Sequence, residues 1–248
     1  MKNKIKFYRD KVAINLLAKD IDNAINVNDT LDGHAVIGVL SKRFDSVAEG
    51  VEYVKEMSSY IPAISIGLGD GDPNQWEMAA NIAAETNSSH VNQVFTTAGY
   101  TLGLLNSRGA NNTLVNALIS PTGQIGKVKI STGPYSSKGN VVVNVENALL
   151  MLKDSNIMAV KFYNIGGKKH IEELIKVAES CAKIGIPIIE PTGGIDRSNI
   201  YEIVKVCMDA GVDKVIPHVY SAAIDKDTGL TDLDIVKKLY DEIKRVFE

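Results

Sequence analysis

The sequence predicts a single α/β domain over residues 1–248, folded as a (β/α)8 barrel of the TIM type. Three observations favour this fold. The length of 248 residues is the usual size of one such barrel. Short apolar runs alternate with amphipathic segments along the whole chain. About eight of these runs are almost entirely apolar, as is typical of parallel strands covered on both faces.

The expected strands follow one another at the spacing of β-α units, and their number matches the number of strands in a barrel. They are Val12–Leu17, Ala35–Leu40, Ala63–Leu68, His90–Phe95, Leu114–Ile119, Ile157–Phe162, Ile186–Ile189 and Lys214–Pro217.

The expected helices are clearest in the second half of the chain. His170–Ile184, Ser198–Ala210 and Thr231–Phe247 carry apolar residues at helical spacing. Gly211 stands where a C-terminal cap belongs, and Thr231 is the expected N-cap of the last helix. These segments predict helices that cover the outside of the barrel.

The region Ser120–Val141 departs from the regular alternation. It is rich in Gly and Pro and contains a strand-like stretch, Lys127–Ser131. We expect an elaborated loop or hairpin at the C-terminal mouth of the barrel, which is where active sites of this fold lie.

The composition, 45% hydrophobic and 23% charged, is that of an ordinary globular protein. A net charge of −3 gives no reason to expect nucleic acid or an anionic membrane as a partner. Cys181 and Cys207 fall in helical, apolar patterns and are expected in the core. No apolar run approaches a membrane span, and no apolar segment follows the basic N-terminus, so we expect a cytoplasmic enzyme.

Lys161 is the strongest candidate for a catalytic residue. It is a lone lysine in the apolar, strand-like run Ile157–Asn164. Burial lowers the pKa of an amine, and a neutral lysine is a nucleophile that can attack a ketone. The alternative is a lysine that reaches solvent or pairs with a carboxylate. Lys129 lies in a similar run and is the rival, but Ile157–Asn164 fits a barrel strand better.

The turn Pro191-Thr192-Gly193-Gly194 is a candidate phosphate site. Glycines let the backbone approach an anion, and the following helix, with Ser198 as the expected cap, adds a favourable dipole. Its place after strand seven is a frequent phosphate site in these barrels. A simple β-α turn is the alternative, because Gly-Gly is common there.

Two further loops carry groups capable of binding a substrate. Gly69 and Asp70 follow strand three, while Asp72 is expected to start the next helix rather than to bind metal. After strand eight, His218, Tyr220 and Ser221 are candidates to complete a substrate or phosphate pocket.

Val160-Lys161-Phe162-Tyr163 resembles the lysine-bearing strand of the class I 2-keto-3-deoxy-6-phosphogluconate aldolases, where Lys-Phe-Phe-Pro carries the Schiff-base lysine. The run Pro191–Ile195 is similar to the phosphate loop of that family. A closer resemblance covers nearly the whole chain and is to the separate aldolase family of bacterial D-glucosaminate breakdown, which cleaves the same compound. The matching segments are Gly38–Lys42, Gly69–Gln75, His90–Phe95, Lys129–Pro134, Glu190–Asp196 and Ile216–Ser221.

The sequence departs from the better-known aldolases at three places, one of which is Asn164 in place of the proline of Lys-Phe-Phe-Pro. Their acid-base glutamate on strand two has no counterpart, because Ala35–Leu40 contains no carboxylate. Their Gly-Gly-Ser turn after the last strand is replaced by His218–Ala222. The proton-transfer group and half of the phosphate site therefore cannot be carried over.

The resemblance implies retro-aldol cleavage of a phosphorylated keto acid to pyruvate and glyceraldehyde 3-phosphate, with no metal or cofactor and with a homo-oligomer as the expected assembly. Lys161 would form the Schiff base, and Glu190 is the candidate acid-base group, with His218 as the alternative. Glu190 could instead be an ion-pair partner that holds a lysine. The remaining candidates are Gly193, Gly194, Thr192 and Ser221 for the phosphate, Lys42 or Lys129 for the carboxylate, and Gly69 and Asp70 for the substrate.

Three other functions stay open at this point. An unphosphorylated keto acid such as 4-hydroxy-2-oxoglutarate would use the same lysine. A sugar-phosphate isomerase or epimerase would keep the phosphate turn but would not need Lys161. A non-catalytic sensor is the third possibility, although a buried lysine is costly to retain for binding alone.

Overall fold

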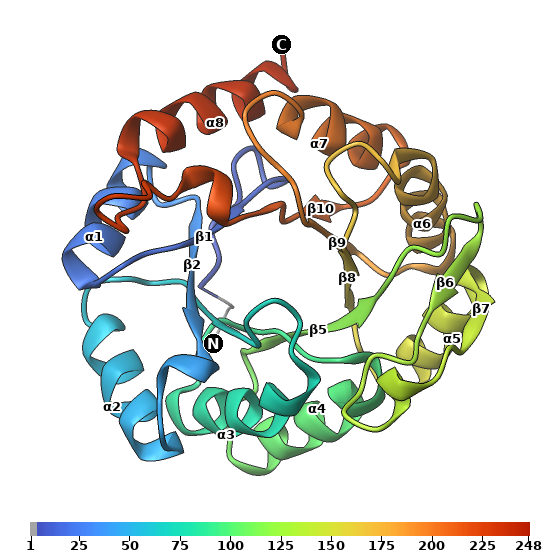
Figure 1. Ribbon diagram of the computed structural model, residues 1–248, viewed down its shortest axis with the longest axis horizontal. Helices are drawn as coiled ribbons and strands as arrows, with labels where there is room; N and C mark the ends of the chain where they lie inside the picture. The colour runs from blue at the N-terminus through green and yellow to red at the C-terminus, as the bar shows by residue number, and fades with distance from the viewer. Residues whose placement is uncertain (1–3) are drawn as a thin grey trace.

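Parallel strands close into a ring in the computed structural model, which describes residues 4–248 (Figure 1). Pairing runs in order around the barrel, and β8 with β9 completes the circle. The barrel strands are β1 (Ile14–Leu17), β2 (Ala35–Leu40), β3 (Ile64–Gly67), β4 (His90–Val91), β5 (Leu114–Ile119), β8 (Ala159–Tyr163), β9 (Ile188–Thr192), β10 (Lys214–Val215) and β11 (His218–Val219). The predicted TIM barrel is confirmed.

Helices surround the strands as an outer ring (Figure 1). They are α1 (Ile21–Thr30), α2 (Val47–Met57), α3 (Trp76–Thr86), α4 (Ala98–Ser107), α5 (Val145–Asp154), α6 (Ile171–Ile184), α7 (Ile200–Asp209) and α8 (Leu233–Arg245). Their apolar faces pack on the outward side chains of the strands and form the main hydrophobic core, which includes both cysteines. Within residues 4–248, no helix combines the length and the apolar character needed to cross a membrane.

The last barrel strand is built from two short pieces. Both β10 and β11 pair with β9, at Lys214↔Ile188 and His218↔Thr192. Pro217 lies in the interruption, and because proline has no N–H it cannot donate to a neighbouring strand. His218 therefore belongs to a strand, where its side chain has a fixed direction, and does not follow the strand as predicted.

Several predicted boundaries are wrong by a few residues. The fourth strand ends at Val91 instead of Phe95, and β9 starts later than predicted and continues to Thr192. The expected cap Ser198 is replaced by Asn199, which makes no side-chain capping bond. Thr231 is likewise not the N-cap of α8.

The cap of α8 is Asp232, whose carboxylate accepts hydrogen bonds from the backbone N–H groups of Asp234 and Ile235. A carboxylate offers more acceptor sites to the free N–H groups of a helix start than a hydroxyl does. Thr231 instead donates its hydroxyl to the carbonyl oxygen of Leu17, at 2.7 Å, and so ties the start of α8 to the end of β1.

The predicted hairpin after strand five is present. Strands β6 (Lys127–Lys129) and β7 (Val142–Asn144) pair antiparallel as a separate two-stranded sheet on the outside of the ring (Figure 1). Buried Glu173 on α6 accepts hydrogen bonds from the backbone N–H groups of Thr122 and Gly123. The connection from β5 into the hairpin is thus fastened to the helix that follows β8.

Candidate active site

The interior of the barrel changes from apolar to polar along the strands. Side chains of successive residues point to opposite faces of a strand, so every second residue faces the barrel axis. Near the N-terminal ends of the strands, Ala13, Val36, Ala159, Ile188 and Ile216 form a small apolar cluster of their own. Two residues further along, four of these five segments carry a buried polar side chain, and the fifth carries Gly38. The four polar residues are Asn15, Lys161, Glu190 and His218.

Lys161 lies in this polar layer, with only 6% of its surface exposed. Its Nζ donates a hydrogen bond of 2.9 Å to Asn92 Oδ1 and lies 5.9 and 6.0 Å from the ring centres of Tyr163 and Tyr220. Burial lowers the pKa of Lys161 to about 8, although the charge of Glu190 opposes the shift. At pH 7 about a tenth of such amines are neutral, far more than for an ordinary lysine. The burial and the pKa both suit a nucleophilic amine.

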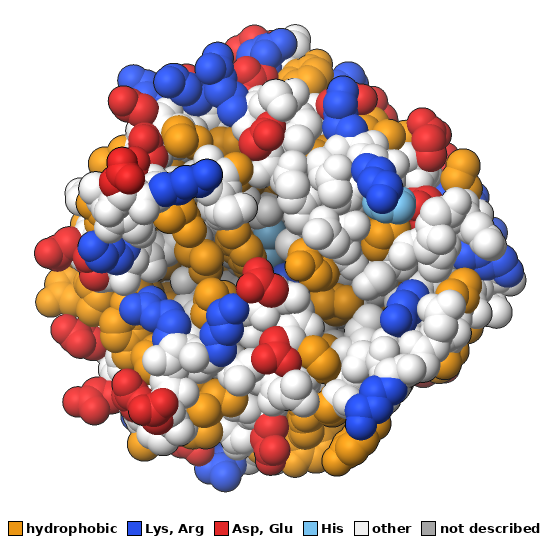
Figure 2. Space-filling view, viewed as in Figure 1, with side chains coloured by type: hydrophobic (Ala, Val, Ile, Leu, Met, Phe, Trp, Pro, Cys, Tyr) orange, Lys and Arg blue, Asp and Glu red, His pale blue; other side chains and the backbone are white. Residues whose placement is uncertain are grey.

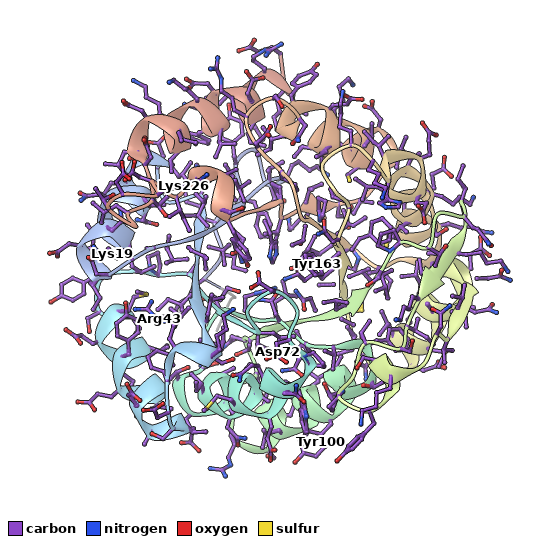
Figure 3. The ribbon with its side chains drawn as sticks, in the orientation of Figure 1. Lys19, Arg43, Asp72, Tyr100, Tyr163 and Lys226 are labelled. Atoms are coloured by element: carbon purple, nitrogen blue, oxygen red, sulfur yellow. The ribbon has the colours of Figure 1, made fainter. Side chains whose placement is uncertain are left out.

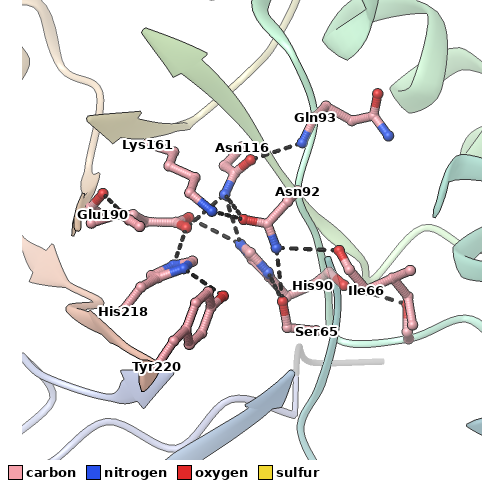
Figure 4. Close-up of polar contacts among 12 residues, drawn as sticks. Ser65, Ile66, His90, Asn92, Gln93, Asn116, Lys161, Glu190, His218 and Tyr220 are labelled. Atoms are coloured by element: carbon pink, nitrogen blue, oxygen red, sulfur yellow. Dashed lines mark hydrogen bonds and ion pairs between the residues drawn. The ribbon is translucent and has the colours of Figure 1, made fainter. Parts of the chain in front are cut away.

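Glu190 pairs with Lys161 across the β8–β9 register and is fully buried. It accepts hydrogen bonds from Asn116 Nδ2 at 2.6 Å, His218 Nε2 at 2.8 Å and His90 Nε2 at 3.0 Å (Figure 4). Burial raises the pKa of Glu190, but the contacts with the two histidines outweigh burial and lower it below its ordinary value. The carboxyl group is therefore an ionised acceptor held by three donors.

Hydrogen bonds extend this network in two directions (Figure 4). On one side, the hydroxyl of Ser65 lies 2.7 Å from His90 Nδ1 and accepts a hydrogen bond from Asn92. On the other side, the hydroxyl of Tyr220 lies 3.0 Å from His218 Nδ1. Burial and the charge of Lys161 lower the pKa of His218 to about 3, so its ring is neutral.

A cavity of about 260 Å³ opens above the polar layer, at the C-terminal ends of the strands. Its entrance is the hollow at the centre of Figure 2, in which a histidine side chain is visible. Lys161, Tyr163 and Tyr220 line the cavity, and Tyr163 points toward the middle of the barrel in Figure 3. The predicted site residues that line it are Gly69, Asp70, Thr192, Gly193, Gly194, His218 and Ser221. Glu190 does not, because it lies behind His218.

The Gly193-Gly194 turn forms one wall of the cavity. Both residues have positive φ angles, of +104° and +67°. A Cβ atom on Gly194 would meet the backbone nitrogen of Gly167 at 2.5 Å, so only glycine fits there. Among the described residues, no acceptor is found for the N–H groups of Gly193 and Gly194. Ser221 begins a short 3-10 turn whose first N–H groups also have no partner within the turn, which makes this wall suitable for an anion.

The two other predicted lysines lie apart from this wall. Lys42 forms an ion pair of 3.1 Å with Asp70 at the rim of the cavity. Lys129 lies on β6, opposite Val142 in the outer hairpin, and is not among the residues that line the cavity. The barrel therefore brings together Lys161, the glycine turn and His218, but it does not bring Lys129 to them. Among the described residues, no group of three or more His, Cys, Asp or Glu is arranged to hold a metal ion.

The sequence analysis missed four polar residues of the network around Lys161 and Glu190. They are Ser65, His90, Asn92 and Asn116. A detectable signal exists for Ser65 and Asn116, because each is a single polar residue in an otherwise apolar strand, the pattern that singled out Lys161. Their mutual contacts depend on the barrel register and are invisible in the sequence.

Solved structures with a similar chain path share the fold but little sequence. A mutant tryptophan synthase α-subunit from Pyrococcus furiosus matches with a TM-score of 0.61 and 14% identity, covering 97% of this chain and 100% of the other. The 3-hexulose-6-phosphate synthase from Salmonella typhimurium matches with a TM-score of 0.58 and 15% identity, covering 95% and 99% of the two chains. Such similarity supports the barrel fold alone.

Sequence comparison is more specific. A protein named 2-dehydro-3-deoxy-phosphogluconate aldolase, from Salmonella typhimurium (strain 14028s / SGSC 2262), is 48% identical over 241 residues, which cover 97% of this chain and 98% of that protein. The KDGP aldolase family matches residues 8–227. This match includes every residue that lines the cavity or belongs to the hydrogen-bond network around Lys161 and Glu190. The chain therefore belongs to the KDGP aldolase family and is an aldolase, an enzyme of the lyase class.

Proposed function

We propose that this enzyme is a class I aldolase that cleaves 2-dehydro-3-deoxy-6-phosphogluconate to pyruvate and glyceraldehyde 3-phosphate through a Schiff base on Lys161. The observation that carries the proposal is the buried amino group of Lys161, which shares one cavity with the N–H groups of Gly193 and Gly194, for which residues 4–248 provide no acceptor. The amine provides a nucleophile for a ketone, and the turn provides donors for a phosphate. The name of the Salmonella relative supports the choice of substrate.

The reaction needs an electron sink and a proton acceptor. Neutral Lys161 attacks the C2 ketone, and loss of water gives an iminium that accepts the electrons of the C3–C4 bond as that bond breaks. A base must take the C4 hydroxyl proton at the same time. We assign the final proton acceptor to Glu190, the ionised carboxylate nearest in the polar layer. Because Glu190 does not line the cavity, the proton must reach it through other groups.

The remaining contacts follow from the cavity wall and rim. We assign the phosphate to the turn of Thr192, Gly193 and Gly194, together with the start of the 3-10 turn at Ser221. Lys42 is the cation we assign to the substrate carboxylate, since it stands beside the loop of Gly69 and Asp70. An incoming carboxylate would replace the exposed side chain of Asp70 as the partner of Lys42.

Borohydride reduction in the presence of pyruvate tests the Schiff base. We expect a pyruvate-derived mass on the peptide that contains Lys161, and no adduct in the variant Lys161→Met. An adduct on Lys129 would show that the wrong lysine was assigned, and absence of any adduct would exclude the class I mechanism. Repeating the trapping with a panel of keto acids compares the phosphorylated substrate with 4-hydroxy-2-oxoglutarate, which has no phosphate for the glycine turn.

A homo-oligomer in the cytoplasm remains our expectation for the assembly and its location. Exposed apolar side chains are concentrated on the outer hairpin and on α5, and such concentrations often mark contacts between chains. They are Ile125, Tyr135, Val141, Val142, Leu150 and Met151. Sedimentation analysis of the purified chain would test the oligomeric state directly.

A further inference from the structure

A continuous line of hydrogen bonds leads from the cavity into the polar layer. Tyr220 and His218 both line the cavity, whereas Glu190 is fully buried behind them. The hydroxyl of Tyr220 lies 3.0 Å from His218 Nδ1, and His218 Nε2 lies 2.8 Å from Glu190 Oε2 (Figure 4). Both distances are those of normal hydrogen bonds. The cavity is thereby connected to a buried carboxylate by two side chains.

The direction of each hydrogen bond follows from the chemistry of the groups. An ionised carboxylate can only accept, so His218 Nε2 carries the hydrogen toward Glu190. A neutral imidazole then has an acceptor at Nδ1, which the hydroxyl of Tyr220 fills as a donor. Burial raises the pKa of Tyr220, so this hydroxyl keeps its proton. Both hydrogen bonds, from Tyr220 to His218 and from His218 to Glu190, therefore donate away from the cavity, toward Glu190.

We propose that Tyr220 is the residue that exchanges protons with the substrate, and that His218 passes each proton to and from Glu190. This inference rests on the Schiff-base function proposed above and extends it. It divides the acid-base role between a group that touches the substrate and a buried group that stores the proton. Tyr220 is the catalytic residue of the three, and Glu190 acts through the others.

The cleavage step moves three protons in one direction. The C4 hydroxyl of the iminium passes its proton to the oxygen of Tyr220, as the proton of Tyr220 moves to His218 Nδ1 and the proton on Nε2 moves to Glu190. The C3–C4 bond breaks, and its electron pair forms the enamine while C4 becomes the aldehyde. Tyr220 and His218 end neutral, and Glu190 ends as a carboxylic acid. No other reactant is needed.

The return step uses the same line in reverse. After the aldehyde leaves, Glu190 returns its proton to His218 Nε2, His218 Nδ1 returns one to Tyr220, and Tyr220 donates its proton to C3 of the enamine. This restores the iminium, now of pyruvate, and the ionised Glu190. Water then releases pyruvate from Lys161. Each proton removed in cleavage is returned in protonation.

Charge balance favours this arrangement inside a dry layer. Before cleavage, the iminium carries a positive charge and Glu190 a negative one, and both are neutral afterwards. Separating charges in a buried site is costly, whereas mutual neutralisation of a neighbouring pair is not. The register places Lys161 directly opposite Glu190, so the pair that neutralises is the pair that already faces across two strands.

Two other groups of the cavity lack such a connection. The ring centre of Tyr163 lies 5.9 Å from Lys161 Nζ, and that of Tyr220 lies 6.0 Å from it. The hydroxyl of Tyr163, however, has no hydrogen-bond partner among the described residues, whereas that of Tyr220 contacts His218. Asp70 is exposed and paired with Lys42, so its carboxylate lies at the surface and not in the polar layer. Tyr163 is therefore a matched control, because it offers the same ring and hydroxyl without a hydrogen-bonded connection to Glu190.

Exchange of the methyl protons of pyruvate in D2O isolates the proposed proton transfer. The enzyme forms the iminium of pyruvate, and Tyr220 must then remove a C3 proton to give the enamine. In Tyr220→Phe we expect exchange, measured by NMR, to fall by about 100-fold or more. Borohydride trapping of pyruvate on Lys161 should persist, because the nucleophilic amine is unchanged and the irreversible reduction accumulates the adduct even where loss of water from the carbinolamine is slower. In Tyr163→Phe the loss of exchange should be at least tenfold smaller.

Each result has a distinct meaning. The proton relay is the path from Tyr220 through His218 to Glu190. Equal losses of exchange in the two tyrosine variants, or full exchange in Tyr220→Phe, would overturn this relay. The Schiff base would still stand in that case if pyruvate is trapped in the wild-type enzyme. Loss of trapping in Tyr220→Phe would also overturn the relay, since the tyrosine would then only hold Lys161 in place. Absence of trapping in the wild-type enzyme would reject the proposed function and the relay together.

Glu190→Gln provides a second, independent variant should Tyr220→Phe fail to fold. Glutamine keeps the shape of the side chain but cannot store the proton. We expect trapping to persist and exchange to fall by about 100-fold, with a larger effect on kcat than on KM for cleavage. Exchange at the wild-type rate in a folded Glu190→Gln enzyme would overturn the relay.

Discussion

Two neighbouring layers of the barrel interior differ completely although the same strands build them. On β8, β9 and the last strand, the lower layer contributes Ala159, Ile188 and Ile216, and the next inward position contributes Lys161, Glu190 and His218. A step of two residues along each strand leads from a purely apolar set of side chains to a hydrogen-bonded set that includes ionisable groups. The two layers have the same backbone geometry, so side-chain identity alone makes the difference.

The comparison indicates what the apolar layer does for the polar one. It closes the barrel from below, so the side chains around Lys161 are excluded from solvent on that side. A low local dielectric strengthens the hydrogen bonds to Glu190 and penalises the charge on Lys161. The lower layer thus sets the environment, and the upper layer carries the buried polar and ionisable groups. Substitutions should affect stability in one layer and chemistry in the other.

Lys161→Met should have the largest effect, and on chemistry alone. We expect cleavage to fall by about 10,000-fold or more, because the nucleophile is lost. Stability should not fall, since methionine replaces a buried amine with an apolar side chain of similar length. Steady-state kinetics and urea unfolding of the two proteins measure both quantities. A stability loss comparable to a core cavity would contradict the division between the layers.

The difference in unfolding free energy between the wild-type enzyme and Lys161→Met should depend on pH. Lys161 has a pKa of about 8 in the folded state and an ordinary pKa of 10.5 when unfolded. Between these values the unfolded chain binds more protons, so the stability of the wild-type enzyme rises with pH relative to Lys161→Met. The full rise, complete near pH 10.5, is about 3 kcal/mol. If the difference in unfolding free energy stayed constant between pH 8 and pH 10.5, Lys161 would have the same pKa in the folded and unfolded states.

Ile188→Ala should give the opposite result. Removing a buried side chain of the lower layer costs about 2–5 kcal/mol of unfolding free energy. Trapping of pyruvate per folded molecule should remain, since the amine and its partners lie one layer above. Denaturant titration together with trapping at low temperature separates the two effects. If trapping vanished while the protein remained folded, the layers would not be independent.

Gly194→Ala should have a smaller effect, confined to the cavity wall formed by the Gly193-Gly194 turn. Alanine is strained at a φ of +67°, and its Cβ would meet the backbone of Gly167. We expect KM for the phosphorylated substrate to rise about 10- to 100-fold, with pyruvate trapping unchanged. Gly103→Ala is the control, because a Cβ on this exposed helical glycine would meet no atom within 4 Å. A similar rise in KM in both variants would disprove a phosphate site at the turn.

The sequence predicts the barrel and the buried lysine of its polar layer because both depend on local patterns. Apolar runs predict strands, and one charge within such a run marks Lys161. Lys129 produces the same local pattern, yet it lies in the outer hairpin, since an apolar run does not reveal which sheet it joins. The partners of Glu190 could not be predicted, because His90 and Asn116 meet it only through the register of a closed barrel.

The boundary of β9 shows a similar limit. Propensity predicts a strand that stops before Glu190, because proline and glycine follow, whereas pairing with β8 extends it to Thr192. Tertiary pairing outweighs local propensity at this point. As a result, Glu190 and Thr192 both point inward from a strand, and the glycine turn begins one residue later.

The loop of Gly69, Asp70 and Gly71 limits how this enzyme can evolve. All three residues have left-handed φ angles, of +71°, +52° and +72°, and a Cβ on Gly69 would meet the side chain of Lys42 at 2.5 Å. Few side chains adopt such a backbone without strain, so this rim tolerates little variation at all three positions, and Asp70 is replaced without strain mainly by asparagine or glycine. Selection for a substrate with a different acidic group at the cavity entrance would therefore act first through Lys42, the ion-pair partner of Asp70.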